Sequence, residues 1–350
     1  VETCRFRGSM CAAATTVPAG IILKPARRFV HGSKRIVQGG LDPNLSRRKP
    51  VQEQGAVAEA KGIAHAETPV TNGLNMQRVI ISGIGVEIPE ASITNDELVE
   101  SFNAWVDVEN DRRAVSGEEP LQKSDSAFIE HASGVRKRHV VERDGILDPA
   151  RMSPRFPLRA DDELSLQAEF GIASARKALA HAGVQAGEVD MVIVSSSHLQ
   201  RPYPAIAIEM QRALGTQGAG FDMGLGCSSA AAALHVAVNL VRSGGQKRVL
   251  VTTPEIITGH LNFRDRQTHF IFGDASVSMV VEAAGEGGSR PGRFEVLDTR
   301  LWTQFSSNIR TNLGYLTRNT QDDPYQINLE GNLIKQVGNK VFKEVTVAGH

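Results

Sequence analysis

The sequence predicts a layered α/β fold with a mostly parallel sheet. From Met76 onward, short apolar runs rich in β-branched residues alternate with stretches of helical periodicity. That alternation is typical of sheets whose two faces are covered by helices. The chain has 350 residues, of which 41% are hydrophobic and 22% charged, so it can bury a sizeable core in one large domain or two ordinary ones.

Each predicted element has a local signal. Thr94 followed by Glu97 forms a capping box that opens a helix, and Gly183 ends a second helix whose apolar residues recur at helical spacing. Buried strands are expected where four or five apolar or β-branched residues run together, at residues 79–82, 191–195, 249–253 and 277–281.

The predicted organisation has four parts. Residues 1–75 read as a basic leader, disordered tail or upstream extension, and residues 76–284 as a first α/β half. Residues 285–292 are rich in Gly, Pro and Ser and predict a linker, after which residues 293–350 begin an unfinished second half.

The leader leaves the compartment open. Residues 1–50 hold ten Lys and Arg residues against two acids, Glu2 and Asp42. Such an Arg-rich, acid-poor segment is typical of an organelle transit peptide, and a disordered or upstream tail is the alternative. We expect a cytoplasmic protein, or a plastid or mitochondrial one if the leader is a transit peptide.

Composition excludes several classes of protein. The formal net charge is zero, which argues against nucleic acid and anionic membranes as partners. Three cysteines, Cys4, Cys11 and Cys227, make no disulfide framework and match no zinc-binding spacing. The chain also lacks an apolar run of the roughly 18 to 20 residues that a membrane-spanning helix needs.

Residues 220–245 carry the strongest chemical signal. Phe221 to Met223 reads as a short strand and Ser228 to Ser243 as a helix, with a Gly-Leu-Gly turn between them, so Cys227 is expected at the start of a helix. The positive end of the helix dipole and the free N–H groups there favour a reactive thiolate, and the Cys227 N–H is a candidate oxyanion donor. The alternative that spacing alone leaves open is a buried core thiol.

Two other motifs are incomplete. The turn lacks the G-x-S-x-G pattern of serine hydrolases. The sequence ISGIGVEIP has Gly83 and Gly85 but Ile88 in place of a third glycine, so a dinucleotide site is not supported.

Together with the Cys227 turn, the stretches DRQTHFIFGD, IFGDASVSMVV and GNLIKQVGNKVFKEV resemble the thiolase-fold condensing enzymes of the β-ketoacyl-acyl-carrier-protein synthase III family. The resemblance covers Met76 to His350. Other stretches, such as SDSAFIEHASGVRKRHV and LQRPYPAIAIEMQRALG, look more like the branch of β-ketodecanoyl carrier-protein synthases. The resemblance to this family implies a five-layered fold of two similar halves that works as a homodimer. It also implies acyl carrier protein and a coenzyme A thioester as partners, and no cofactor.

The resemblance also implies site residues. Cys227 matches the nucleophile, Arg266 the arginine that contacts the adenine end of coenzyme A, and Tyr203 the residue that reaches the neighbouring subunit's acyl pocket. Phe128 and Ala132 stand where a tryptophan and an arginine are common, which suggests altered handling of the donor. The family's His and Asn belong to motifs expected beyond His350.

The resemblance therefore implies an acyltransferase that condenses an acyl primer, possibly of medium chain length, with malonyl carrier protein in fatty acid biosynthesis. Two alternatives stay open: a non-condensing acyltransferase of the same fold, and a non-catalytic protein that binds acyl groups or carrier protein. The histidines near strand ends, His198, His260 and His269, are candidates for a dyad with Cys227, but they are predicted to be structural or solvent-facing instead.

Overall fold

A computed structural model describes residues 77–285, 293–303, 309–310 and 335–336 of the protein. All of them belong to one compact unit of the chain. The predicted leader, most of the predicted linker and most of the second half lie outside the described residues, so the predicted domain boundaries stay predictions.

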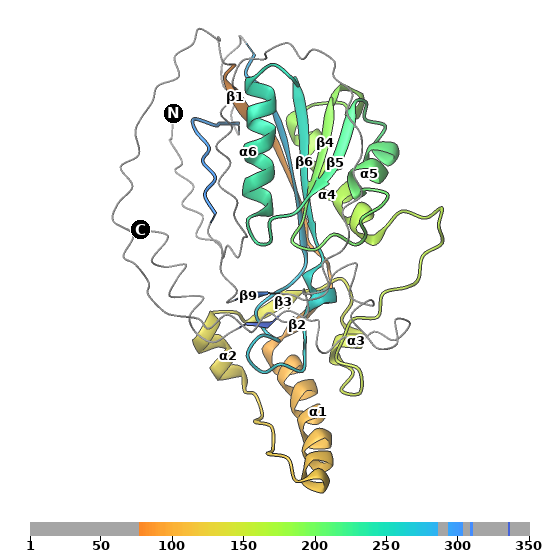
Figure 1. Ribbon diagram of the computed structural model, residues 1–350, viewed down its shortest axis with the longest axis vertical. Coiled ribbons are helices and arrows are strands. Elements are labelled where there is room, and N and C mark those ends of the chain that lie inside the picture. The colour runs from red at the N-terminus through yellow and green to blue at the C-terminus, as the bar shows by residue number, and fades with distance from the viewer. Residues whose placement is uncertain (1–76, 286–292, 304–308, 311–334, 337–350) are drawn as a thin grey trace, which may run out of the picture. The chain divides into compact units, whose positions relative to one another are not determined.

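A six-stranded sheet forms the centre of this unit (Figure 1). Its strand order is β5-β4-β6-β7-β1-β8. The strands are β1 (Val79–Glu87), β4 (Met191–Ser195), β5 (Ala219–Met223), β6 (Arg248–Glu255), β7 (Ala275–Ala283) and β8 (Phe294–Glu295). Each predicted strand is present, and three of the four are longer than the apolar run that predicted them.

The sheet is mixed, so the prediction of a mostly parallel sheet is wrong. β4 runs parallel to β5 and β6, whereas β7 is antiparallel to β6 and β1, and β8 is antiparallel to β1. Between β6 and β7, residues 256–274 contain only the short 3-10 helix η2 (Ile257–His260). A parallel pair needs a crossover connection that is usually an α-helix, and none is present there.

Helices cover both faces of the sheet. α4 (Leu166–Ala182) and α5 (Ile206–Leu214) pack on one face, and α6 (Ser229–Arg242) packs on the other (Figure 1). β4 shows the division, because Val192 and Val194 join the core with α4 and α5, whereas Met191 and Ile193 join the core with α6. This alternation gives three layers: helix, sheet and helix.

The two glycines of β1 let α4 lie directly on the strand backbone. A Cβ at Gly83 would lie 2.3 Å from the Ala178 carbonyl oxygen, and one at Gly85 would lie 2.1 Å from the Ser174 oxygen. Close packing therefore explains the Gly-x-Gly sequence that begins like a dinucleotide fingerprint.

A smaller lobe follows β1 in the chain. It contains α1 (Asn95–Ser116), α2 (Ser126–Ser133), α3 (Asp144–Leu147) and the antiparallel pair of β2 (Ser92–Thr94) with β3 (Lys137–His139). The predicted capping box is confirmed: Glu97 N donates to Thr94 Oγ1 and Thr94 N donates to the Glu97 carboxylate. The helix runs on to Gly117, whose φ of 72° ends it in the left-handed region.

Asp274, at the start of β7, ties the lobe to the sheet. Its carboxylate accepts hydrogen bonds from Val141 N at 2.8 Å, Thr258 N at 3.0 Å and Thr258 Oγ1 at 2.7 Å. These hydrogen bonds fix the turn that leads into β7.

The remaining elements are the 3-10 helix η1 (Ala186–Glu188) and the pair of β9 (Ile309–Arg310) with β10 (Lys335–Gln336). Within the described part of the chain, no helix combines the length and apolar character that crossing a membrane requires. The same residues contain no group of three His, Cys, Asp or Glu side chains placed to hold a metal ion.

Candidate active site

Cys227 lies on the connection between β5 and α6. Leu225 and Cys227 form an isolated bridge around Gly226, whose φ of 56° lies in the left-handed region. The residue is exposed. The predicted strand-to-helix turn is thus confirmed, and the alternative of a buried core thiol is wrong. We call residues 224–229 the elbow.

Ser229 closes the elbow from inside. Its hydroxyl accepts a hydrogen bond from Leu225 N at 2.9 Å and donates one to the Gly226 carbonyl at 2.8 Å. The cap residue of α6, Ser228, makes no side-chain capping bond, so the hydroxyl of Ser229 is the one that organises this turn. The turn presents Cys227 beside the positive end of the α6 dipole, which favours a negative charge there.

The end of β4 supports the elbow from behind. Ser195 Oγ donates to the Ser229 carbonyl at 2.9 Å, and Ser196 N donates to the Met223 carbonyl at 3.3 Å. A Cβ at Gly224 would lie 3.2 Å from the Ser196 carbonyl oxygen, so the chain at Gly224 passes close to β4. The elbow is therefore held on the β5 side and on the α6 side by the same short segment.

Glu255 and Gln167 hold that segment in turn. The Glu255 carboxylate accepts from Ser197 N at 2.8 Å, Ser197 Oγ at 2.6 Å and Ser196 Oγ at 3.1 Å. Gln167 Nε2 donates to Ser196 Oγ at 3.1 Å and to the carbonyls of His198 and Pro254. Burial raises the pKa of Glu255, and the hydrogen bonds from Ser197 oppose that rise.

Of the three histidines that follow strand ends, His269 is buried, whereas His198 and His260 are half-buried. His198 stacks on His260 with 4.2 Å between ring centroids, and His269 stacks on Phe102 at 4.6 Å. Burial lowers the pKa of His198, and it lowers the pKa values of His260 and His269 to about 4. Since each ring is stacked on another ring, the structure fits the interpretation that the three histidines are structural.

The structure brings Arg266 and Phe128 together. The Arg266 guanidinium lies over the Phe128 ring, 4.8 Å from its centroid, and Arg266 Nε donates to the Lys123 carbonyl at 2.7 Å. Phe128 is 38% exposed and meets Phe270 edge-on. We call Arg266 and Phe128 the cation–aromatic platform.

Tyr203 lies between β4 and α5 and is 85% exposed. It follows β4, whereas Cys227 follows β5 and Arg266 follows β6. β4 lies between β5 and β6 and runs parallel to both, so the chain segments that carry these three residues all follow the carboxyl ends of the strands. In open α/β sheets the carboxyl edge is where ligands bind.

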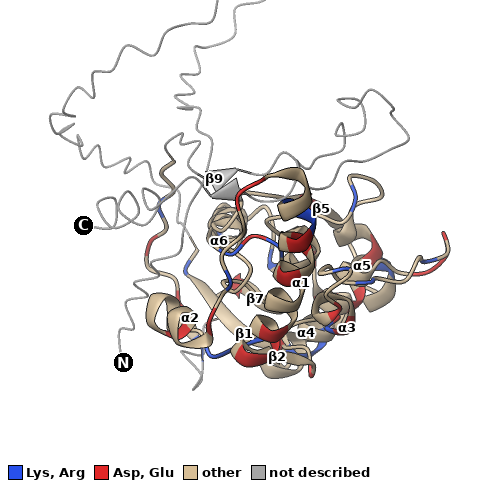
Figure 2. Ribbon diagram, turned by 90° about the horizontal axis from the view of Figure 1, so that it is seen from below, with Lys and Arg blue, Asp and Glu red and all other residues tan. Residues whose placement is uncertain are grey.

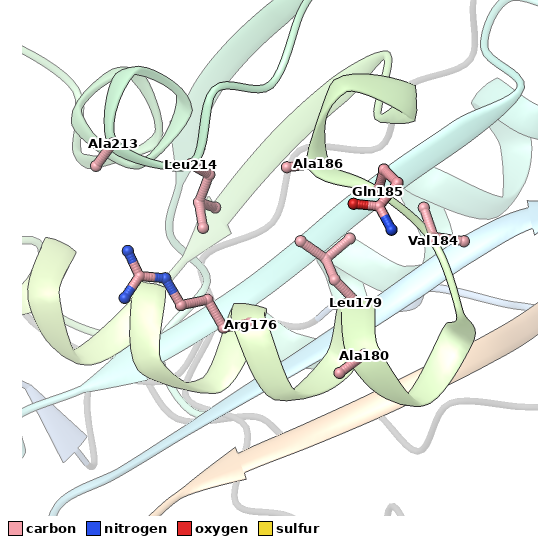
Figure 3. Close-up of a pocket in the computed structure, with 8 residues that line it drawn as sticks. All are labelled: Arg176, Leu179, Ala180, Val184, Gln185, Ala186, Ala213 and Leu214. Carbon is pink, nitrogen blue, oxygen red and sulfur yellow. The ribbon is translucent and has the colours of Figure 1, made fainter.

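A hollow lies near the amino-terminal end of β4, opposite the end from which Tyr203 follows. It has a volume of about 330 Å³ and is lined by α4, α5 and the turn before β4, with Arg176 beside Leu179 and Leu214 (Figure 3). Ala186 of its wall precedes β4, so this hollow lies away from the edge that carries the elbow. It is therefore not part of the candidate site.

The sequence predicted the position of Cys227 but not the residues that support the elbow. Sequence reasoning missed four of these supporting residues: Ser229, Ser195, Glu255 and Gln167. The Glu255 and Gln167 contacts join residues that are 58 and 29 positions apart from their serine partners, and local pattern does not reveal such contacts.

Comparison with known proteins identifies the family. Residues 221–299, which include the elbow and the platform arginine, match the family described as 3-oxoacyl-(acyl-carrier-protein) synthase III. The chain is 49% identical over 251 residues to the β-ketodecanoyl-(acyl-carrier-protein) synthase of Pseudomonas aeruginosa, which covers 71% of each chain. The chain therefore belongs to the 3-oxoacyl-(acyl-carrier-protein) synthase III family.

Two further relatives extend the comparison. The β-ketoacyl-(acyl-carrier-protein) synthase III of Granulibacter bethesdensis is 28% identical over 230 residues, which cover 65% of this chain and 58% of that protein. The solved 3-oxoacyl-(acyl carrier protein) synthase III of Pseudomonas aeruginosa superposes with a TM-score of 0.56 at 21% identity, covering 77% of this chain and 67% of that one. The predicted thiolase-like fold class is confirmed.

Proposed function

We propose that the protein is an acyltransferase that elongates an acyl thioester by decarboxylating condensation with malonyl carrier protein. The observation that carries the proposal is the exposed Cys227 on a turn closed by Ser229 at the start of α6. Membership of a family of 3-oxoacyl-(acyl-carrier-protein) synthases supports the same chemistry.

The first half-reaction acylates the cysteine. The Cys227 thiolate attacks the carbonyl carbon of the acyl thioester, a new carbon–sulfur bond forms, and the bond to coenzyme A breaks with its sulfur leaving as a thiolate. The α6 dipole favours the negative charge on Cys227 before attack. The Cys227 backbone N–H is the candidate donor for the oxyanion that forms during it.

The second half-reaction forms the carbon–carbon bond. Carbon dioxide leaves the malonyl group, and the electron pair of the broken bond becomes an enolate. The enolate carbon attacks the acyl carbonyl on Cys227, and the Cys227 thiolate leaves. The product is a β-ketoacyl carrier protein two carbons longer than the primer.

Two observations suggest how the donor is recognised. In the proposal, the Arg266 guanidinium on the platform meets the nucleotide end of coenzyme A, since a guanidinium suits both stacking and phosphate pairing. The relative named for a β-ketodecanoyl product suggests an octanoyl primer, because condensation adds two carbons.

The proposal includes a second copy of the chain. β5 is at an edge of the six-stranded sheet and exposes Phe221, while Ile208 of α5 and Tyr203 expose large apolar surface nearby in the chain. An edge strand with exposed apolar side chains favours pairing with another strand. Tyr203 is then placed to reach the neighbouring subunit's acyl pocket.

The direct test is to incubate the full-length protein with octanoyl-coenzyme A and malonyl carrier protein. We expect release of carbon dioxide and a β-ketodecanoyl product, both abolished by Cys227→Ala. Acyl transfer to an alcohol or amine without carbon dioxide release would instead support the non-condensing alternative. Retained product formation in Cys227→Ala would rule out the proposed nucleophile.

A further inference from the structure

The chain between α1 and α2, residues 117–125, is fixed along α1 by two asparagine side chains. We call it the arm. Asn110 Nδ2 donates to the Leu121 carbonyl at 3.1 Å, and Leu121 N donates to Asn110 Oδ1 at 2.6 Å. Asn103 makes the same pair with Ser124, at 3.0 Å and 2.9 Å. Each amide thus acts as a neighbouring strand would.

The two asparagines act as one device. They lie seven positions, or about two turns, apart on α1, so they share one face of the helix. Asn110 holds the earlier part of the arm and Asn103 the later part, so the arm runs back along α1. Paired donor and acceptor bonds fix both the position and the orientation of its peptide groups.

The arm delivers one carbonyl to Arg266. Lys123 lies between the two anchored residues, and its carbonyl oxygen accepts from Arg266 Nε at 2.7 Å. The Phe128 ring supports the guanidinium from one side. These two contacts fix the plane of the guanidinium, and within the described residues neither of its Nη groups has a hydrogen-bond partner among the side chains and carbonyls.

The turn that carries Arg266 is fixed to the same helix. Asp265 accepts from Thr268 Oγ1 at 2.8 Å and from Gln267 N at 2.9 Å, which shapes the turn on either side of Arg266. His269, at the end of that turn, stacks on Phe102 of α1, next to Asn103. α1 therefore positions both the backbone of Arg266 and the carbonyl that holds its side chain.

Ion pairs also hold the start of the arm, but they do not reach Arg266. Glu118 pairs with Arg112 at 3.2 Å and with Arg113 at 3.6 Å, and all three side chains are partly exposed. Figure 2 shows acidic positions on both α1 and α2. The Lys123 ammonium pairs with Asp107 at 2.7 Å, and both side chains are more than half exposed, so this ion pair contributes little. The contact that reaches Arg266 comes from the backbone of the arm, whatever side chain stands at position 123.

We propose that Asn103 and Asn110 are positioning residues for Arg266, and that through it they set the affinity for nucleotide-bearing acyl donors. The inference rests on the proposed function, in which Arg266 meets the phosphate and purine of coenzyme A. A long arginine side chain loses rotamer freedom when it binds a ligand. The arm removes that freedom in advance and leaves both Nη groups for bidentate pairing with phosphate.

The test compares two donors in the full-length protein, octanoyl-coenzyme A and octanoyl-pantetheine, which lacks the nucleotide. We expect Asn110→Ala and Asn103→Ala each to raise the KM for octanoyl-coenzyme A about tenfold, and to leave the KM for octanoyl-pantetheine within about twofold. Arg266→Ala is expected to do the same, and Asn110→Ala added to Arg266→Ala should cause no further loss. Asn239→Ala, on the exposed side of α6, is the matched control.

Three outcomes would overturn the inference. Equal losses for both donors would show that the asparagines support only the fold of the lobe. If the KM for octanoyl-coenzyme A is unchanged in both asparagine variants but raised in Arg266→Ala, Arg266 contacts the donor and the asparagines do not position it. An unchanged KM in Arg266→Ala, with Cys227 still acylated, would overturn the arm and the donor contact but not the proposed condensation.

Discussion

The elbow and the platform reach the same edge of the sheet by different means. The elbow is held by short hydroxyl side chains, Ser229 within it and Ser195 behind it, both almost fully buried. The platform is built at the surface from two large side chains. Arg266 is held by the Lys123 carbonyl of the arm and lies over the ring of Phe128. Substitutions at the elbow should therefore affect both the stability of the domain and the reaction. Substitutions at the platform should affect only the binding of the nucleotide end of the donor.

The largest effect on stability is expected where α4 packs on β1 of the central sheet. Gly83→Ala would place a methyl group 2.3 Å from the Ala178 carbonyl, so α4 must move off β1. We expect the free energy of unfolding to fall by about 3 kcal/mol, measured by urea denaturation. Gly187→Ala, where an added Cβ meets nothing within 4 Å, is the control and should change little. Equal stability of the two variants would mean that α4 and β1 are not so closely packed.

Acid should weaken the packing that holds the lobe against the Arg266 turn. Burial lowers the pKa of His269 from 6.5 to about 4, so below pH 6.5 the unfolded chain takes up a proton that the folded one does not. The stability that comes from keeping His269 neutral is fully present above pH 6.5 and is lost as the pH falls toward about 4. At that pH the loss in the free energy of unfolding is about 2 to 3 kcal/mol. His269→Phe should reduce the loss, as seen in urea denaturation at pH 7 and pH 4.5. An identical pH dependence in the variant would contradict a buried neutral His269.

At the elbow itself, Ser229→Ala removes both hydrogen bonds that close the turn. We expect the rate of Cys227 acylation to fall about tenfold, and equally for octanoyl-coenzyme A and octanoyl-pantetheine, because the turn acts on the thiol and not on the nucleotide. Ser243→Ala, at the other end of α6, is the matched control. A loss confined to octanoyl-coenzyme A would erase the distinction between elbow and platform.

The smallest effect is expected at the exposed ion pair of the lobe. Asp107→Asn breaks the Lys123–Asp107 pair, whose side chains are 51% and 61% exposed. We expect the free energy of unfolding to change by about 0.5 kcal/mol or less, because exposed ion pairs contribute little. A loss larger than that of Asn110→Ala in the same denaturation assay would show that charge, and not the paired amides, holds the arm.

The two regions also differed in how far the sequence predicted them. The strand, turn and helix around Cys227 are contiguous, so periodicity and glycine placement were enough to predict Cys227 at the start of a helix, and the family resemblance suggested its role as nucleophile. Arg266 and Phe128 were identified separately from the family resemblance, and nothing local indicated that they stack. The Asn103 and Asn110 pairs span 21 and 11 positions, beyond the range of a local pattern.

Two features of the fold were also misjudged for physical reasons. The direction of β7 depends on its connection to β6, which lacks the crossover helix that a parallel pair needs. The end of α1 was missed, since only its start was predicted: Val108 and Val115 are exposed and obscure the apolar stripe of an amphipathic helix. The second half that the resemblance implies lies largely outside the described residues.

The most direct test of the central claim is intact-protein mass spectrometry after incubation with octanoyl-coenzyme A alone. We predict that the protein gains the mass of one octanoyl group, that peptide mapping locates it on Cys227, and that Cys227→Ala gains none. An octanoyl group retained by Cys227→Ala, or mapped to another residue of the wild-type protein, would contradict the assignment of the elbow as the acyl-transfer site.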